Sequence, residues 1–307
     1  MKKLTRNQLR EERNGFLFAL PWIIGFLCLS LYPLLMSLYY SFTEFNPIVK
    51  PKWVGLNNFK SLFSDRRFYN SLSNTCFYAF VATPIYLSIA IMLAMIVNKK
   101  FKGRSVVRTL FFLPSIIPMV ASTMVWIWMF DPTYGYINNF LAFLGIEGPA
   151  WLINPKTTMW SLIMMGMWGT GTTMLVCLAA LQDVPTSYYE SADLDGANGI
   201  QKFFYITLPS IAHVVIYQAI LNLINAFQYF TQVYVITTAS GGSSAEASGG
   251  PENSILMYPL YLFHNAFIYM KMGKASAMAW ILFIVVGLLT ILMVKLTNKT
   301  TENAGVE

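Results

Sequence analysis

The chain has 307 residues, of which 56% are hydrophobic and only 11% are charged. A soluble domain carries about 25% charged residues, so this chain requires an apolar solvent around part of itself. The composition excludes a soluble enzyme, a disordered regulator and a disulfide-stapled secreted domain. The net charge is +7, and the basic residues lie in the loops. This distribution is explained by contact with a membrane surface and by topology, so no nucleic-acid partner is expected.

Six apolar stretches are long enough to cross the hydrocarbon core, which needs about 20 residues. None of them contains Asp, Glu, Lys or Arg, and one charge at mid-membrane costs about 2.5–3.5 kcal/mol. The first stretch is longer than the apolar run of a cleaved signal peptide and is followed by large side chains. The sequence therefore predicts an all-α membrane protein with six transmembrane helices, at residues 16–41, 76–97, 110–130, 158–181, 211–236 and 275–294.

The basic residues predict the orientation, because cytoplasmic loops are enriched in Lys and Arg. The loop 98–109 alone holds five basic residues and no acid. Both termini are therefore predicted to be cytoplasmic. Residues 1–15 are expected to form an N-terminal segment, 16–296 the six-helix transmembrane domain and 297–307 a tail. The expected outside loops are 42–75, 131–157 and 237–274.

Two residue types inside the spans carry further predictions. The cysteines, at positions 28, 76 and 177, lie in or beside apolar runs without metal-ligand spacing, which predicts small buried side chains. Prolines bend helices, which fits a translocation pathway and also a plain structural bundle. They stand at positions 21, 33, 84, 114 and 118.

The loop between spans four and five, residues 182–210, differs from the other inside loop because it holds four acids. Ser187 followed by Glu190 predicts a capping box that opens a helix. Gly196 suits the left-handed turn that closes one, and apolar residues resume with helical spacing from Ile200. We expect two short helices around a glycine turn, a rigid unit suited to docking into a groove on another protein.

These residues resemble the signature of the integral membrane subunits of ATP-binding-cassette importers. The signature is Glu-Ala-Ala, three residues, Gly, nine residues and Ile-x-Leu-Pro. Here it reads Glu-Ser-Ala at 190–192, Gly196 and Ile-Thr-Leu-Pro at 206–209, with Ser191 as the one departure. Matches to the carbohydrate-uptake, maltose-type branch lie at 53–59, 74–75 and 249–251.

The resemblance implies a division of labour with a cytoplasmic ATPase. The loop from Glu190 to Pro209 is expected to dock on a dimer of ATP-binding-cassette subunits, whose closure switches the permease between inward-facing and outward-facing states. The alternative for Glu190 is a capping acid that serves only its own helix. The expected docking residues are Glu190, Ser191, Ala192, Asp195, Gly196 and Ala197.

The same resemblance implies the setting of the chain. It is expected to be a multi-pass protein of the bacterial cytoplasmic (inner) membrane, in contact with lipid, a second homologous permease and an extracellular or periplasmic solute-binding protein. No Gly-x-x-x-x-Gly-Lys-Ser/Thr pattern occurs, so the chain is expected not to be an enzyme. We expect no catalytic residue, metal or cofactor on it, and ATP and Mg²⁺ on the partner ATPase.

Span five carries five polar side chains at spacings of four, three, four and three, which predicts one helix face. Uncharged polar groups in hydrocarbon need partners. These side chains either form hydrogen bonds with a partner permease or line a pathway for a polyhydroxylated solute. Its members are Gln218, Asn222, Asn225, Tyr229 and Gln232.

The absence of charge from the spans bears on the substrate. A phosphate or carboxylate would be expected to meet Arg or Lys, so the sequence favours a neutral sugar, an oligosaccharide, with a polyol or glycerol phosphate as the alternative. An ion-coupled secondary transporter is disfavoured because no span holds an acid. Four tryptophans are candidates either for stacking on sugar rings or for interface anchors, at positions 126, 128, 160 and 168.

Overall fold

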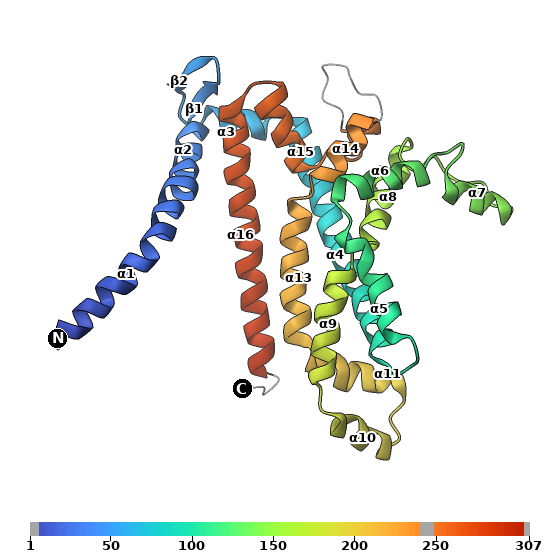
Figure 1. Ribbon diagram of the computed structural model, residues 1–307. Helices are drawn as coiled ribbons and strands as arrows, with labels where there is room; N and C mark the ends of the chain where they lie inside the picture. Colours follow the sequence, from blue (N-terminus) through green and yellow to red (C-terminus); the bar gives the residue numbers. More distant parts are fainter. Residues whose placement is uncertain (1–5, 240–248, 304–307) are drawn as a thin grey trace. The chain divides into compact units, whose positions relative to one another are not determined.

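The computed structural model describes residues 6–239 and 249–303 of the chain. The expectations for 240–248, for 1–5 in the N-terminal segment and for 304–307 in the tail lie outside this range. The described chain is mostly helical, which confirms the predicted all-α class (Figure 1). It divides into two compact units, residues 1–64 with 265–282 and residues 65–264 with 283–307.

The first unit begins with one long helical stretch. It consists of α1 (Arg6–Phe26), a π-helical turn η1 (Leu27–Leu31) and α2 (Tyr32–Ser41). Residues Glu12–Ser41 are long and apolar enough to cross a membrane, and the most apolar part of this stretch has no buried side chain. Cys28 is exposed on it, so the prediction of a buried cysteine is wrong at this position. An exposed apolar helix surface can be stable in a membrane because lipid is as apolar as leucine.

A β-hairpin follows in the first unit. Strands β1 (Thr43–Asn46) and β2 (Val49–Trp53) pair antiparallel, and the hairpin leads into α3 (Asn57–Phe63). Asn58 joins the two, because its Nδ2 donates to the carbonyl oxygens of Ser41 and Thr43 at 2.9 and 2.8 Å. Asn58 belongs to the segment 53–59 that resembles the carbohydrate-uptake branch. Its hydrogen bonds to the start of the hairpin give this residue a structural role.

The rest of the first unit is the segment 265–282. It contains most of the π-helical turn η5 (His264–Ile268) and the first part of α16 (Met272–Asn303), the helix that supplies the sixth predicted span. The helix begins directly against the hairpin. A Cβ atom on Gly273 would lie 2.1 Å from the Thr43 carbonyl oxygen, so only glycine permits this approach.

The second unit is built around α4 (Arg66–Asn98), which Asp65 caps by accepting from the Arg67 backbone N–H at 3.0 Å. Pro84 lies within α4 without interrupting it. Helices α9 (Gly171–Asp183) and α13 (Ala212–Phe227) pack along α4. Their shared core is rich in small side chains, which allow close helix approach in membranes. It contains Ala90, Ala94, Val97, Cys177 and Ile211.

Three predicted spans are broken rather than continuous. Span three consists of α5 (Arg104–Phe112), the 3-10 turn η2 (Leu113–Ile116) and α6 (Met119–Met129), bent by 99°. Span four consists of α8 (Pro155–Met167) and α9, bent by 50°. Span five, predicted at 211–236, is interrupted between α13 and α14 (Thr231–Ala239). A bend of 72° separates it from the preceding segment Gly199–Ser210, which belongs to the loop 182–210. With each bent pair counted as one span, the described chain has up to six candidate spans by length and composition, which agrees with the number predicted.

Prolines explain only part of this bending. Pro114 and Pro118 flank the break in span three, where the missing backbone donor favours interruption. The break after α8 lies among Gly166, Gly169 and Gly171 instead. The interruption between α13 and α14 contains neither proline nor glycine, so the sequence pattern did not indicate it.

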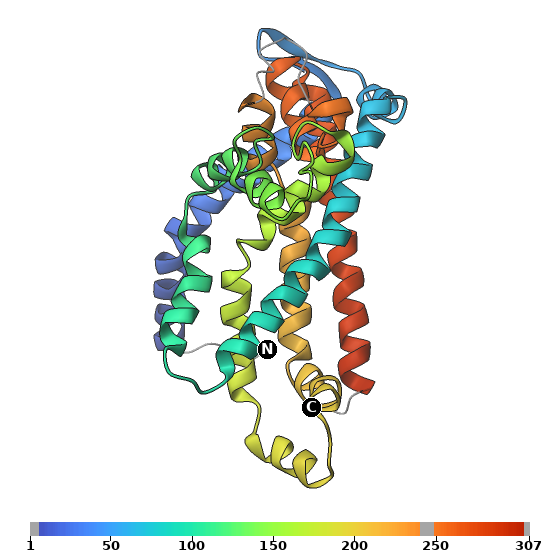
Figure 2. The same cartoon turned by 90° about the vertical axis from the view of Figure 1, so that its right-hand side faces the viewer.

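Short elements close the two ends of the second unit. At one end lie α7 (Tyr136–Phe143), η4 (Pro251–Asn253) and α15 (Tyr258–Phe263). Asn74 of α4 holds η4 and the residues that follow it against α4, because its Nδ2 donates to the carbonyl oxygens of Asn253 and Leu256 at 2.9 and 3.2 Å. At the other end α10 (Thr186–Leu194), α11 (Gly199–Lys202), η3 (Phe203–Thr207) and α12 (Leu208–Ser210) project beyond α9 and α13 (Figures 1 and 2).

Candidate functional site

A cavity of about 570 Å³ lies in the second unit where the three broken spans meet. Its volume falls within the roughly 300–1,000 Å³ of small-molecule sites. The lining includes the ends of helices at all three breaks and the middle of α4. Among the described residues, no Asp, Glu, Lys, Arg or His side chain lines it. Its polar side chains are Tyr78, Thr83, Tyr86, Ser115, Ser122, Thr123, Trp126, Trp168, Thr172, Asn222, Asn225, Gln228, Tyr229, Thr231 and Gln232.

Several of these polar groups have no partner within the protein. Among the described residues, seven buried side-chain nitrogen or oxygen atoms lack a hydrogen bond. Four of the seven line this cavity: Thr83 Oγ1, Trp126 Nε1, Asn222 Nδ2 and Tyr229 Oη. Buried polar groups are normally satisfied, so their concentration here indicates a site that water or a hydroxyl-bearing ligand completes.

Aromatic side chains form two sides of the cavity. Tyr78 packs on Tyr229 with ring centroids 4.4 Å apart and hydrogen-bonds Tyr86 through the hydroxyl oxygens at 3.1 Å. The Tyr86 hydroxyl donates to the Ile163 carbonyl at 3.0 Å, next to the break after α8. Trp126 and Trp168 meet edge to face at 5.8 Å. The aromatic surface is thus held in place by contacts among α4, α6, the C-terminal part of α8 and the non-helical segment after α13.

The structure places four of the five polar residues predicted as a stripe on span five at the cavity. Asn222, Asn225, Tyr229 and Gln232 line the cavity. Gln218 is buried outside it. The prediction of one continuous helix face is wrong, because α13 ends at Phe227 and α14 begins at Thr231. Tyr229 stands in the interruption, and its side chain reaches the cavity from non-helical backbone.

Sequence reasoning missed most of the remaining lining. Tyr78, Thr83 and Tyr86 come from α4, and none of them belongs to a motif noted in the sequence. The signal available in the sequence was the presence of polar side chains inside an apolar span. Of the four tryptophans considered, Trp126 and Trp168 line the cavity, whereas those at positions 128 and 160 are exposed on the helix surface.

The loop 182–210 forms the predicted pair of short helices around a glycine turn. Helix α10 ends at Leu194, and Gly196 follows with φ +74°, in the left-handed region. The Gly196 N–H donates to the Asp193 carbonyl at 3.1 Å and the Ala197 N–H to the Ala192 carbonyl at 2.9 Å. This is the double hydrogen bond of a Schellman motif, so the predicted role of Gly196 in the turn is confirmed.

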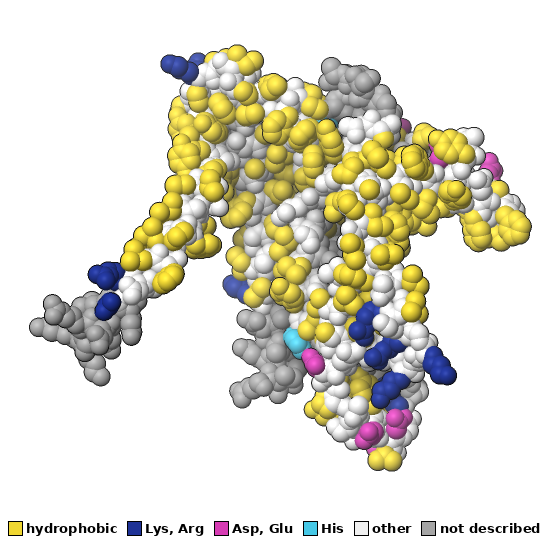
Figure 3. Space-filling model, in the orientation of Figure 1, with side chains coloured by type: hydrophobic (Ala, Val, Ile, Leu, Met, Phe, Trp, Pro, Cys, Tyr) yellow, Lys and Arg dark blue, Asp and Glu magenta, His cyan; other side chains and the backbone are white. Residues whose placement is uncertain are grey.

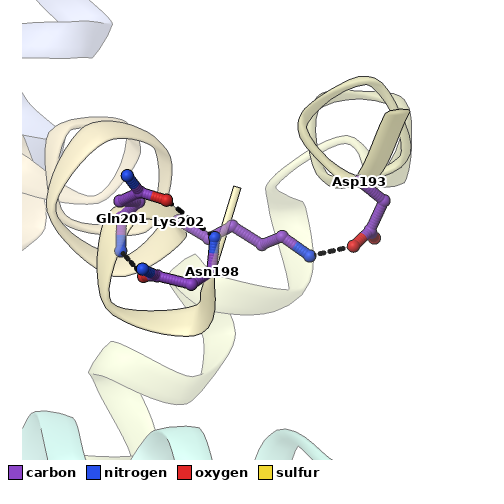
Figure 4. Close-up of polar contacts among 4 residues, drawn as sticks. All are labelled: Asp193, Asn198, Gln201 and Lys202. Carbon is purple, nitrogen blue, oxygen red and sulfur yellow. Dashed lines mark hydrogen bonds and ion pairs between the residues drawn. The ribbon is translucent and has the colours of Figure 1, made fainter. Parts of the chain in front are cut away.

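The prediction of a capping box between Ser187 and Glu190 is wrong. Helix α10 starts at Thr186 directly after Pro185, without a side-chain cap, so Ser187 already lies inside it. The capping box of this loop belongs to α11 instead. The Gln201 N–H donates to Asn198 Oδ1 at 2.9 Å, and the Asn198 N–H donates to Gln201 Oε1 at 2.8 Å (Figure 4). Glu190 makes no capping hydrogen bond in α10.

Two side-chain contacts fix α10 against the second half of the loop. Asp193 forms an ion pair with Lys202 (Figure 4). The hydroxyl oxygens of Tyr189 and Thr207 lie 3.1 Å apart. Ala192 is buried, while Glu190, Ser191, Asp195 and Gly196 are exposed and Ala197 is half-buried. The loop therefore presents a fixed surface, which includes Leu194 with 91% of its side chain exposed.

Comparison with known proteins gives a family for this arrangement. Residues 61–302 match a family described as the inner membrane component of binding-protein-dependent transport systems. The chain is 40% identical over 301 residues to the probable ABC transporter permease protein YesP of Bacillus subtilis (strain 168), covering 97% of this chain and 94% of that protein. It is 30% identical over 291 residues to the probable starch degradation products transport system permease protein AmyD of Thermoanaerobacterium thermosulfurigenes, covering 94% and 96%.

The fold has a close counterpart among solved structures. A chain from the crystal structure of a bacterial ABC transporter involved in the import of the acidic polysaccharide alginate superimposes with a TM-score of 0.82. The match covers 97% of this chain and 100% of that one, at 23% sequence identity. At this identity the likeness concerns the fold and not the substrate.

Proposed function

Because this chain belongs to the family of binding-protein-dependent transport system inner membrane components, we propose that it is the permease subunit of an ATP-driven importer for a neutral oligosaccharide. It forms half of the translocation pathway, and a second homologous permease forms the other half. A dimer of ATPase subunits holds ATP and Mg²⁺, and an extracellular or periplasmic binding protein delivers the sugar. Both termini and the loop 182–210 face the cytoplasm of a bacterium.

The cavity at the helix breaks is the observation that supports the substrate class. Its unpartnered atoms include two N–H donors, Trp126 Nε1 and Asn222 Nδ2, and two hydroxyls that donate or accept, on Thr83 and Tyr229. Sugar hydroxyl groups also donate and accept, so they can satisfy all four. The indole and phenol rings beside them offer faces for the apolar side of a pyranose. The relative named for starch degradation products is consistent with such a solute.

An anionic solute fits this cavity less well. A phosphate would have to be desolvated without any Lys, Arg or His side chain on the lining, and buried anions are normally paired. Glycerol phosphate is therefore the weaker candidate, and a neutral polyol is the closer alternative. An ion-coupled mechanism lacks the acidic side chain that proton or sodium coupling normally uses.

Two substitutions on one helix test the pathway. Asn222→Leu removes an amide that lines the cavity, whereas Gln218→Leu removes a buried amide one turn away that lies outside it. In proteoliposomes of the full complex, uptake of labelled oligosaccharide by the Asn222 variant should show an apparent affinity about 3–10-fold weaker, the value of one hydrogen bond. The Gln218 variant should transport normally. Equal losses in both, or saturable uptake of glycerol phosphate by the wild type, would contradict the proposal.

Docking of the ATPase on the loop 182–210 needs a separate test. Its support is the fixed and exposed surface around Glu190, together with the signature it carries. Glu190→Lys should prevent copurification of the ATPase subunits while the permease still inserts. Asp183→Lys is the matched control, because Asp183 is an exposed acid at the end of α9, outside the signature. Full ATPase recovery with the Glu190 variant would remove that residue from the interface.

A further inference from the structure

The turn between α4 and α5 is strongly basic and has no internal counter-charge. It carries Lys99, Lys100, Lys102, Arg104 and Arg108, and residues 98–109 contain no acid. Within the described part of the chain, none of these five side chains makes an ion pair or a hydrogen bond. Lys and Arg side chains gather over this end of the second unit (Figure 3). The neighbouring Lys202, by contrast, is paired with Asp193.

Arg108 lies half-buried at the base of this turn. Its Nε is buried and has no hydrogen-bond acceptor among the described residues. A buried donor without an acceptor is unfavourable. An anion bound at the turn would supply counter-charge to the guanidinium of Arg108 and to the three lysines.

The surfaces on either side of the turn indicate the kind of anion. Met92 and Ile96 form a strip at the end of α4, and Val106 and Leu110 form one at the start of α5, each pair one helical turn apart. These four side chains are between 51% and 62% exposed. In a membrane-spanning protein such strips face acyl chains, so the basic turn lies at the level of the lipid headgroups.

We propose that this turn is a binding site for an anionic phospholipid. The lysines at 99, 100 and 102 and the arginines at 104 and 108 hold the phosphate, and the acyl chains lie along the two apolar strips. An acidic protein surface offers the same charge, but it provides nothing to cover the strips. The five cations and the strips together match a molecule that joins an anionic head to hydrocarbon.

The position of the site gives it a structural consequence. Helix α5 packs on α9, and a Cβ atom on Gly171 would lie 2.6 Å from the Phe111 carbonyl oxygen, so the two backbones are in close contact. Helix α9 continues into the loop 182–210. A lipid that holds the start of α5 therefore also supports the helix from which that loop extends. The inference does not depend on which solute is transported.

The test is the lipid that remains bound to the purified full complex. Wild-type complex extracted in mild detergent should retain phosphatidylglycerol enriched over phosphatidylethanolamine relative to the source membrane, as measured by mass spectrometry. Each lysine near a membrane surface contributes a roughly fivefold preference for anionic lipid. K99Q/K100Q/K102Q should therefore lower the enrichment at least about tenfold. K50Q/K52Q, which changes two exposed lysines on β2, should leave it unchanged.

A salt series on the wild-type complex supplies a second measurement, independent of how the triple variant folds. Enrichment should fall as NaCl rises from 0.1 to 1 M, because salt screens exposed charges. Absence of enrichment in the wild type, or equal loss in both variants, overturns the proposal. Unchanged lipid combined with loss of the ATPase from the triple variant also overturns it, because the cations would then contact an acidic protein.

Discussion

Replacement of Gly196 by alanine tests how backbone geometry in the loop supports docking. Gly196 has φ +74°, where a residue with a Cβ pays about 1–2 kcal/mol. No heavy atom lies within 4 Å of the position that this Cβ would occupy. The expected effect is therefore conformational strain alone, without a clash, and it falls on the two hydrogen bonds that close α10.

A destabilisation of about 1–2 kcal/mol lowers the population of the native turn roughly 5–30-fold relative to opened conformations. Hydrogen–deuterium exchange of the Ala197 amide, which donates to the Ala192 carbonyl, should accelerate by the same factor. Recovery of ATPase subunits with the tagged permease should fall in parallel, because docking then has to restore the turn.

Gly199→Ala is the matched control, since Gly199 also has open space around it but lies in α11 with ordinary helical backbone. It should exchange and assemble as the wild type does. Gly196→Asn should recover part of the loss, because asparagine tolerates the left-handed region. Wild-type exchange in Gly196→Ala, or an equal effect of Gly199→Ala, would refute the reasoning.

Further predictions concern other parts of the chain. Gly273→Ala should destabilise the first unit by about 1–3 kcal/mol, because its Cβ would overlap the Thr43 carbonyl oxygen. Thermal unfolding should show a lower melting temperature for this variant. Gly287→Ala, which has open space around its Cβ, should keep the melting temperature of the wild type. Burial and the Arg67 charge lower the pKa of His264 from 6.5 to about 4. As the pH falls, His264 therefore takes up a proton in the unfolded chain before it does so in the folded protein. The contribution of neutral His264 to the free energy of unfolding is complete above pH 6.5, and up to about 3 kcal/mol of it is lost as the pH falls toward 4. His264→Gln should show a smaller decrease in melting temperature between pH 7 and pH 4.5, and an identical decrease would contradict the assignment.

The sequence alone indicated the helical membrane class, a number of spans that agrees with the up to six candidates in the described chain, and the turn at Gly196. Transfer of a span into lipid depends on the sum of its own side chains, so composition predicts it without knowledge of neighbours. The Schellman turn depends on hydrogen bonds between residues only three and five apart. The capping box was predicted at the wrong residue because Ser187 and Asn198 both have Glu or Gln three residues later. Helix α10 starts at Thr186, directly after Pro185, so Ser187 lies inside the helix and only Asn198 forms the box.

Only the tertiary structure decided where the spans break and which polar side chains share a cavity. A Cβ atom on Gly166 would lie 1.9 Å from the Tyr86 hydroxyl, so the break after α8 is adapted to a tyrosine far away in the sequence. The same packing brings Tyr86 and Asn222 to one cavity and leaves Gln218 outside it. Such contacts join separate helices, and the periodicity of one helix cannot specify them because it contains no information about its neighbours.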